Sequence, residues 1–184
     1  MSDSLHARLR HATAEAHAAL ERDLDWEARV ATLSGYRDLL ARLRGFHAVY
    51  EPAIGAALAD ASFFDPRRRL AFLDADLAGL SSGAAPVSSP APPRLDGAGG
   101  ALGALYVLEG STLGGAVIGR HVARLHGEGV PLAYYSGRGR AAGPLWRAFR
   151  ERLDGLPEAQ AASAFTAGIG TFEAMRRWLV SGEG

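Results

Sequence analysis

The chain has 184 residues, 48% of them hydrophobic and 22% charged, which suits one folded domain and is short for two. Its formal net charge is zero, and this argues against sequence-independent nucleic-acid binding, which needs a basic excess. Cysteine is absent, so disulfide bonds, iron–sulfur clusters and thiolate catalysis are excluded. All 20 of the Lys and Arg residues are arginine, so a bound anion would be held by guanidinium or backbone N–H groups.

Apolar residues recur every three or four positions along almost the whole chain, which is the spacing of amphipathic helices. Ser34 and Asp65 are the expected N-caps of two of these helices, and Asp25 is a candidate cap for a further short one. Pro52 is expected to kink or end its helix. The predicted helices cover about 4–22, 34–54, 65–77, 98–126, 143–154 and 157–180.

Two segments lack the helical spacing. Residues 81–97 are rich in Ser, Pro and Ala, and we expect a flexible loop inside one domain, because neither flank could easily fold alone. Residues 127–143 are the second loop. No useful β-alternation occurs, so the expected fold is all-α, a single-domain helical bundle spanning 1–184.

The N-terminal segment is charged throughout and does not resemble a secretory signal. No run of about 20 apolar residues suggests a membrane span. We therefore expect a cytoplasmic protein that acts without a membrane and without nucleic acid.

The segment LEGSTLGGAV, residues 108–117, places three glycines inside a predicted helix, where each costs about 1 kcal/mol relative to alanine. A phosphate-binding loop is excluded, because no strand precedes the glycines and no lysine follows them. Two interpretations stay open. Either the pairs Gly110/Gly114 and Gly115/Gly119 let another helix approach closely, or a flat ligand lies on bare backbone.

The first predicted helix carries a polar stripe, because Arg10, Thr13, His17 and Glu21 are separated by three, four and four residues. A solvated face is the simplest explanation. As a site, His17 would be an axial iron ligand with Glu21 orienting it, and Arg10, roughly 10 Å along the axis, would meet an acidic group. The remaining histidines fit surface or edge positions: His6, His11, His47, His121 and His126.

Three segments resemble the heme oxygenase family. LRHATAEAHAALE, residues 9–21, resembles the proximal-helix motif, in which the His after Ala-Thr-x-x-x is the axial ligand. LYVLEGSTLGGAVIGRHV, residues 105–122, resembles the distal-helix signature, and AFTAGIGTFEAMRRWL, residues 164–179, is similar to the last helix. The order and length match from end to end. The resemblance is closest to bacterial members that supply biliverdin to bacteriophytochromes.

This resemblance implies heme b held between the helix of His17 and a distal helix kinked at its glycines. Heme would be both cofactor and substrate, opened by O2 and electrons to biliverdin, CO and free iron. The electron donor would be a ferredoxin, a reductase or ascorbate, and a bacteriophytochrome could receive the biliverdin. The implied heme-binding residues are His17 as the metal ligand, Arg10, Glu21, Tyr106, Gly110, Gly114, Gly115, Arg150, Phe165 and Phe172.

One position departs from the family pattern. Many members have an Asp directly after the first distal glycine, where it organises proton-delivering waters, and here that residue is Ser111. Ser111, Gly110 and Gly114 are the expected catalytic positions, with Ser111, Thr112 or backbone-bound water relaying protons. Glu109 is about 100° further round the helix and is expected to point away.

Two other functions stay open. A heme-binding or sensor protein on the same fold would hold heme without degrading it, and Ser111 keeps that alternative open. A thiamin-degrading enzyme ranks last, since that branch of the fold relies on a cysteine and this chain has none.

Overall fold

The computed structural model describes residues 4–80, 89–136 and 138–181, and for residues 111–113 it describes the backbone only. Within these ranges the chain is helical and contains no strand, which confirms the all-α prediction. The α-helices are α1 (Leu5–Leu24), α2 (Trp26–Arg29), α3 (Leu33–Leu58), α4 (Ala61–Phe64), α5 (Leu70–Gly79), α6 (Gly97–His126), α7 (Ala133–Ser136), α8 (Ala142–Asp154) and α9 (Ala161–Ser181); the 3-10 helices are η1 (Asp65–Arg67), η2 (Gly139–Ala141) and η3 (Glu158–Gln160).

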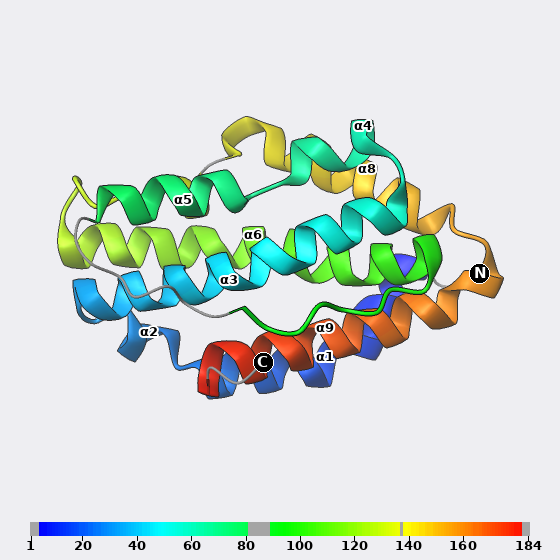
Figure 1. Ribbon diagram of the computed structural model, residues 1–184, viewed down its shortest axis with the longest axis horizontal. Coiled ribbons are helices and arrows are strands. Elements are labelled where there is room, and N and C mark those ends of the chain that lie inside the picture. The colour runs from blue at the N-terminus through cyan, green and yellow to red at the C-terminus, as the bar shows by residue number, and fades with distance from the viewer. Residues whose placement is uncertain (1–3, 81–88, 137, 182–184) are drawn as a thin grey trace.

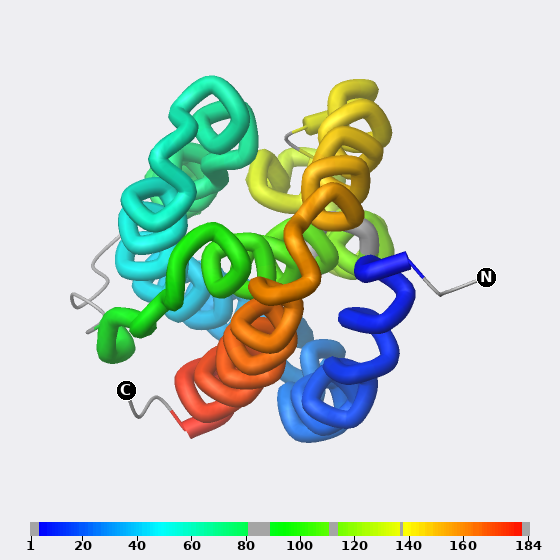
Figure 2. Tube along the Cα trace, turned by 90° about the vertical axis from the view of Figure 1, so that its right-hand side faces the viewer, coloured from blue at the N-terminus to red at the C-terminus, as the bar shows by residue number. Residues whose placement is uncertain are grey.

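The central helix is α6, which packs along α9 and α3. In Figure 1, α5 and α8 lie on one side of α6, and α9 and α1 lie on the other. Seen from the end in Figure 2, α6 (green) runs through the middle, while α1 (blue) lies on the outside. α1 packs mainly on α9 and to a smaller extent on α8.

Glycines set how closely the long helices cross. A Cβ atom at Gly103 of α6 would collide with the backbone of Ala164 of α9. A Cβ at Gly168 of α9 would lie 3.1 Å from both the Leu9 and the Thr13 side chains of α1. α9 therefore approaches both α6 and α1 through positions that have no side chain.

The α6 helix is long and apolar enough, by length and composition, to cross a membrane, with a mean hydropathy of 1.4 over its most apolar window. However, 60% of that window is buried inside the protein. Such burial is what the central helix of a helical bundle shows, so the apolar character of α6 is explained by its packing.

Two of the local predictions were wrong, and of the alternatives given for Pro52 the structure excludes a helix end there. The N-cap of α3 is Thr32, whose hydroxyl accepts a bond from the Gly35 N–H, and not Ser34. Asp65 and Pro66 begin only the short 3-10 turn η1, because the next α-helix starts at Leu70. α3 continues past Pro52, which is exposed, as far as Leu58.

His47 was expected at a surface or edge position and is instead fully buried. The burial is tolerated because both ring nitrogens have hydrogen-bond partners. Its Nδ1 lies 2.8 Å from Glu51 Oε1, and its Nε2 lies 3.1 Å from the Tyr134 hydroxyl. Burial lowers the pKa of His47, and the neighbouring Glu51 carboxylate opposes that shift. Sequence spacing could not reveal this site, since Tyr134 belongs to α7, a helix within the segment predicted as a loop.

Buried carboxylates connect α3, α5 and α7. Glu51 Oε1 accepts bonds from the backbone N–H groups of Arg69 and Leu70, at 2.7 and 3.1 Å, where α5 begins. Asp76 of α5 accepts bonds from the N–H groups of Ala133 and Tyr134, at 2.7 and 2.8 Å, where α7 begins. Glu51 thus satisfies free backbone N–H groups at the start of α5, and Asp76 does the same at the start of α7.

The predicted loop 81–97 lies partly outside the described residues, which resume at Ser89. Residues 89–96 have no regular secondary structure, and Pro90 is buried. α6 then begins at Gly97, whose φ of 58° is one that glycine adopts readily.

Candidate functional site

The polar stripe on α1 includes a half-exposed imidazole. The side chain of His17 is 53% exposed, and its Nε2 lies 3.3 Å from Glu21 Oε1, one turn along the helix. The other ring nitrogen has no hydrogen-bond partner among the described residues. A carboxylate on one nitrogen of a histidine is the usual arrangement when the other nitrogen binds a metal.

Phe172 of α9 connects this stripe to α6. Its ring centroid lies 5.0 Å from that of His17 and 6.5 Å from that of Tyr106. Phe172 is 7% exposed. The side chains of α1, α9 and α6 therefore meet around one aromatic ring, one helical turn before Gly110.

The next two turns of α6 have an open face. A Cβ atom added at Gly110 or at Gly114 would meet no atom within 4 Å. Val117, three residues beyond Gly114 and on the same face, is 52% exposed, which is high for a valine. A side-chain-free backbone followed by an exposed apolar side chain is a surface that a flat apolar ligand would cover.

Gly115 was expected to face the ligand, but the structure places it elsewhere. A Cβ at Gly115 would lie 3.0 Å from Tyr135 Cδ1, and one at Gly119 would lie 2.9 Å from Tyr135 Cβ. These two glycines therefore allow α7 to pack on α6. Of the two interpretations of the glycine pattern, helix packing applies to the second pair and an open backbone to the first.

Two arginines without ion-pair partners among the described residues lie at one end of the stripe. Arg10 of α1 and Arg150 of α8 are both exposed. Burial has the largest effect on the pKa of His6 and lowers it; the charges of Arg150 and Arg10 also lower it, whereas the nearby Asp154 carboxylate raises it. Both guanidinium groups thus lie near the His6 ring. Burial also raises the pKa of Tyr106, against opposing effects of Thr13 and Arg10.

The sequence interpretation missed His6 and Trp146. The His6 ring lies 6.0 Å from that of Tyr106 and 5.5 Å from that of Trp146. His6 precedes Arg10 by four residues, and Trp146 precedes Arg150 by four, so each lies one turn from a predicted residue. Searching one turn before Arg10 and one turn before Arg150 would have found both.

Phe165 lies away from His17. The guanidinium of Arg8 lies 5.4 Å from the Phe165 ring and also pairs with Glu158. Arg8 and His17 are nine residues apart, which is about half a turn net at roughly 100° per residue, so they face opposite sides of α1. Phe165 is seven residues before Phe172 and so lies on the same face of α9, and its place in the lining of the site stays a prediction.

Behind Gly110, the preceding residue is a buried acid. Glu109 is 3% exposed, and its Oε1 lies 2.8 Å from Arg138 Nη1 and 3.8 Å from Arg67 Nε. The carboxylate therefore points towards the segment before η2 and towards η1. This direction agrees with the expectation that Glu109 points away from the ligand. Ser111 lies within α6, but its side chain is outside the described part of the structure, as is that of Thr112.

A single imidazole can bind a metal only if the metal brings its other ligands. Among the described ranges, no group of three or more His, Asp or Glu side chains is placed to hold a metal ion. A porphyrin brings four nitrogens of its own and leaves the axial positions to the protein. A flat macrocycle with acidic substituents also fits the bare α6 backbone and the unpaired Arg10 and Arg150.

The comparisons with known proteins show the family and the fold. The profile of the heme oxygenase family matches residues 3–179. The fold is similar to that of the NO- and CO-bound heme oxygenase of Neisseria meningitidis, with a TM-score of 0.76, 22% sequence identity, and coverage of 100% of this chain and 94% of that one. A search of curated proteins finds no match by sequence. Since the family profile covers almost the whole length of an all-α chain, this protein belongs to the heme oxygenase family.

Proposed function

We propose that this protein binds heme b through His17 and degrades it to biliverdin, CO and free iron. Membership of the family and the shared fold support heme oxygenase function in general. The observation that carries the finer proposal is the placement of His17 beside Phe172, with the side-chain-free positions Gly110 and Gly114 on the neighbouring helix. Bound heme would supply both the iron that activates O2 and the ring that is opened.

Each residue then has one task. Glu21, whose Oε1 lies 3.3 Å from His17 Nε2, would orient the ring and leave the other nitrogen free to act as ligand. Gly110 and Gly114 leave room on the distal side for a diatomic molecule between ligand and backbone. Arg10 and Arg150 hold the acidic edge of the substrate, and their spacing from His17 would select how it is rotated in its plane.

The rings of Phe172 from α9 and Tyr106 from α6 are in contact and provide an apolar surface for the ligand beside His17. The Tyr106 hydroxyl is protonated at neutral pH, and burial raises its pKa further, so it can donate a hydrogen bond at the same edge as Arg10. Ser111 is proposed to hold a water at the distal side, because its hydroxyl can position a proton donor but cannot supply the charge of a carboxylate.

The partners of the reaction are proposed from the family. The reaction needs an external electron donor, which would be a ferredoxin, a reductase or ascorbate, and a bacteriophytochrome is a candidate acceptor of biliverdin. We place the protein in the cytoplasm of a bacterium on the same basis.

Hemin titration of the purified protein tests the binding step. One hemin should bind per chain with a sharp Soret band, and His17→Ala should abolish or strongly shift that band. His11→Ala is the matched control, because His11 is an exposed histidine of the same helix with no contact to Phe172. Absence of a 1:1 complex, or equal effects of the two substitutions, would contradict the proposed ligand.

Turnover is tested separately by adding a reductant in air. The Soret band should decay while biliverdin absorbance and CO appear in step. If the hemin complex survives repeated reduction and releases no CO, the protein binds heme without degrading it, and the sensor alternative is correct.

A further inference from the structure

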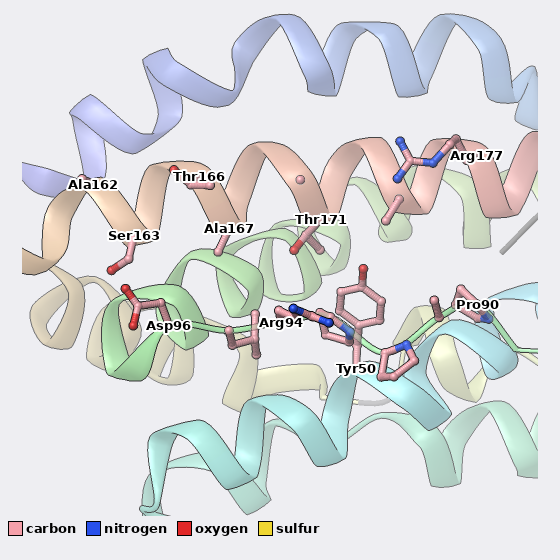
Figure 3. Close-up of a pocket in the computed structure, with 16 residues that line it drawn as sticks. Tyr50, Pro90, Arg94, Asp96, Ala162, Ser163, Thr166, Ala167, Thr171 and Arg177 are labelled. Atoms are coloured by element: carbon pink, nitrogen blue, oxygen red, sulfur yellow. The ribbon is translucent and has the colours of Figure 1, made fainter.

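A second cavity lies on the other side of α9. It has a volume of about 620 Å³ and lies between α9, residues 90–96 and Tyr50 of α3 (Figure 3). Gly170, which lines it, is two residues from Phe172 and thus about 200° round the helix, so the cavity and the proposed heme site lie on nearly opposite faces of α9. Its volume is within the range of small-molecule sites, roughly 300–1,000 Å³.

The walls of this cavity are apolar and stiff. On one side, Pro90, Pro92 and Pro93 fix the backbone φ angles of the extended segment. On the other side, α9 contributes only small side chains along most of its length here, including Ala167. A Cβ at Gly170 would meet no atom within 4 Å, which shows that the space over this turn of α9 is open.

Two hydroxyl groups that line the cavity have no partner among the described residues. Tyr50 and Thr171 are each 3% exposed, and neither hydroxyl forms a hydrogen bond within the described ranges. In Figure 3 the Tyr50 hydroxyl points into the space below α9. Neither oxygen is among the fully buried side-chain atoms that lack a partner, so both are accessible from the cavity and free to bond to a ligand or to water. A tyrosine hydroxyl is protonated at neutral pH and can donate a hydrogen bond, and burial raises the pKa of Tyr50 further from that range.

The charged groups of the cavity favour an anion. Arg94 from the extended segment and Arg177 from α9 both line it, and neither guanidinium has an ion pair or hydrogen bond to a described residue. Arg177 is close enough to Tyr50 to lower its pKa, against the effect of burial. Asp96 at one end is the single acid in the lining, which leaves a formal charge of +1.

We propose that this cavity binds an amphipathic organic carboxylate. Its apolar body would lie between the prolines and the small residues of α9, and its carboxylate would accept hydrogen bonds from Arg94 and Arg177. Tyr50 and Thr171 would donate further bonds to it. This site is separate from the heme site and does not depend on heme turnover.

Calorimetric titration with two probes, dodecanoate and 1-pyrenebutyrate, tests the proposal on the full chain with and without hemin. At least one probe should bind one per chain in both states, and its methyl ester should bind at least tenfold more weakly. Arg94→Gln and Arg177→Gln should each weaken binding by about 10- to 100-fold, as expected for charge-assisted hydrogen bonds, and Tyr50→Phe by about 2- to 10-fold. Arg124→Gln, at an exposed arginine on α6, is the control and should change nothing.

A blocking variant separates loss of the site from loss of the fold. Gly170→Leu has open space at its Cβ and a better helix former in place of glycine, so it should fold at least as stably and yet lose the probe. Hemin binding should be unchanged in this variant. The proposal is overturned if neither probe binds, if ester and acid bind equally, or if Gly170→Leu and the two arginine variants bind as the unmodified chain does.

Discussion

Replacing Gly110 and Gly114 with alanine should make the protein more stable and less active. Neither position contacts a neighbour, since an added Cβ would meet nothing within 4 Å. The methyl group therefore relieves the glycine penalty in the middle of α6 without creating a clash. The same methyl groups would occupy the space that the proposed distal site leaves for the substrate.

The expected magnitude follows from helix propensity. Each Gly→Ala change in a helix interior contributes about 1 kcal/mol, so the double variant should gain about 2 kcal/mol in the free energy of unfolding. For a chain of this size that is a rise in Tm of about 4–8 °C. Gly115→Ala should behave differently, because its Cβ would be 3.0 Å from Tyr135 and the strain would offset the gain.

Thermal unfolding of the heme-free protein, followed by circular dichroism, measures the stability, and the rate of CO release measures activity. Gly114→Leu should impair CO release more than Gly114→Ala, and both should leave the heme-free fold intact. The reasoning is refuted if Gly114→Ala destabilises the protein as much as Gly115→Ala, since Gly114 would then be a packing position. It is equally refuted if Gly114→Leu releases CO at the normal rate.

Three further outcomes are expected. Glu109→Ala should lower the free energy of unfolding by about 3–5 kcal/mol in urea titrations, because it leaves Arg138 buried without its carboxylate. Burial lowers the pKa of His47, so the folded state binds a proton at His47 less readily than the unfolded state does. The free energy of unfolding should therefore fall as the pH drops below about 6.5, the pKa of an unperturbed histidine. His47→Gln should flatten this pH dependence in unfolding curves recorded between about pH 5 and pH 7. Arg10→Ala or Arg150→Ala should change the ratio of biliverdin isomers separated by chromatography, and an unchanged ratio in both would argue against their holding the acidic edge.

The sequence was sufficient to predict what depends on local spacing. The long helices follow from the recurrence of apolar residues, and the stripe containing His17 and Glu21 follows from the helical repeat, which the structure confirms as a 3.3 Å contact. The contact between His17 and Phe172 depends on how α9 packs on α1, and no local pattern encodes it. The resemblance to the family named His17 and Phe172 separately as heme-binding residues and did not imply their contact.

What could not be predicted depends on partners distant in the chain. His47 and Glu51 have helical spacing, but their burial depends on Tyr134, 87 residues after His47. In the glycine-rich segment, spacing alone treats Gly114 and Gly115 alike. The position of Tyr135 distinguishes them, because it fills the space beside one and not the other. The kink implied at these glycines stays a prediction, since α6 is one continuous helix from Gly97 to His126.

The position of α1 at the outside of the bundle bears on how a large rigid ligand enters and leaves. α1 carries His17, yet it is held mainly by its contact with α9, whereas α6 and α9 pack closely through Gly103. Separating α1 from the rest of the bundle would break its packing on α9 at Gly168 and on α8, but not the crossing of α6 and α9 at Gly103. Exchange of a substrate and an open-chain product by that route would leave the carboxylate-linked α3, α5 and α7 undisturbed.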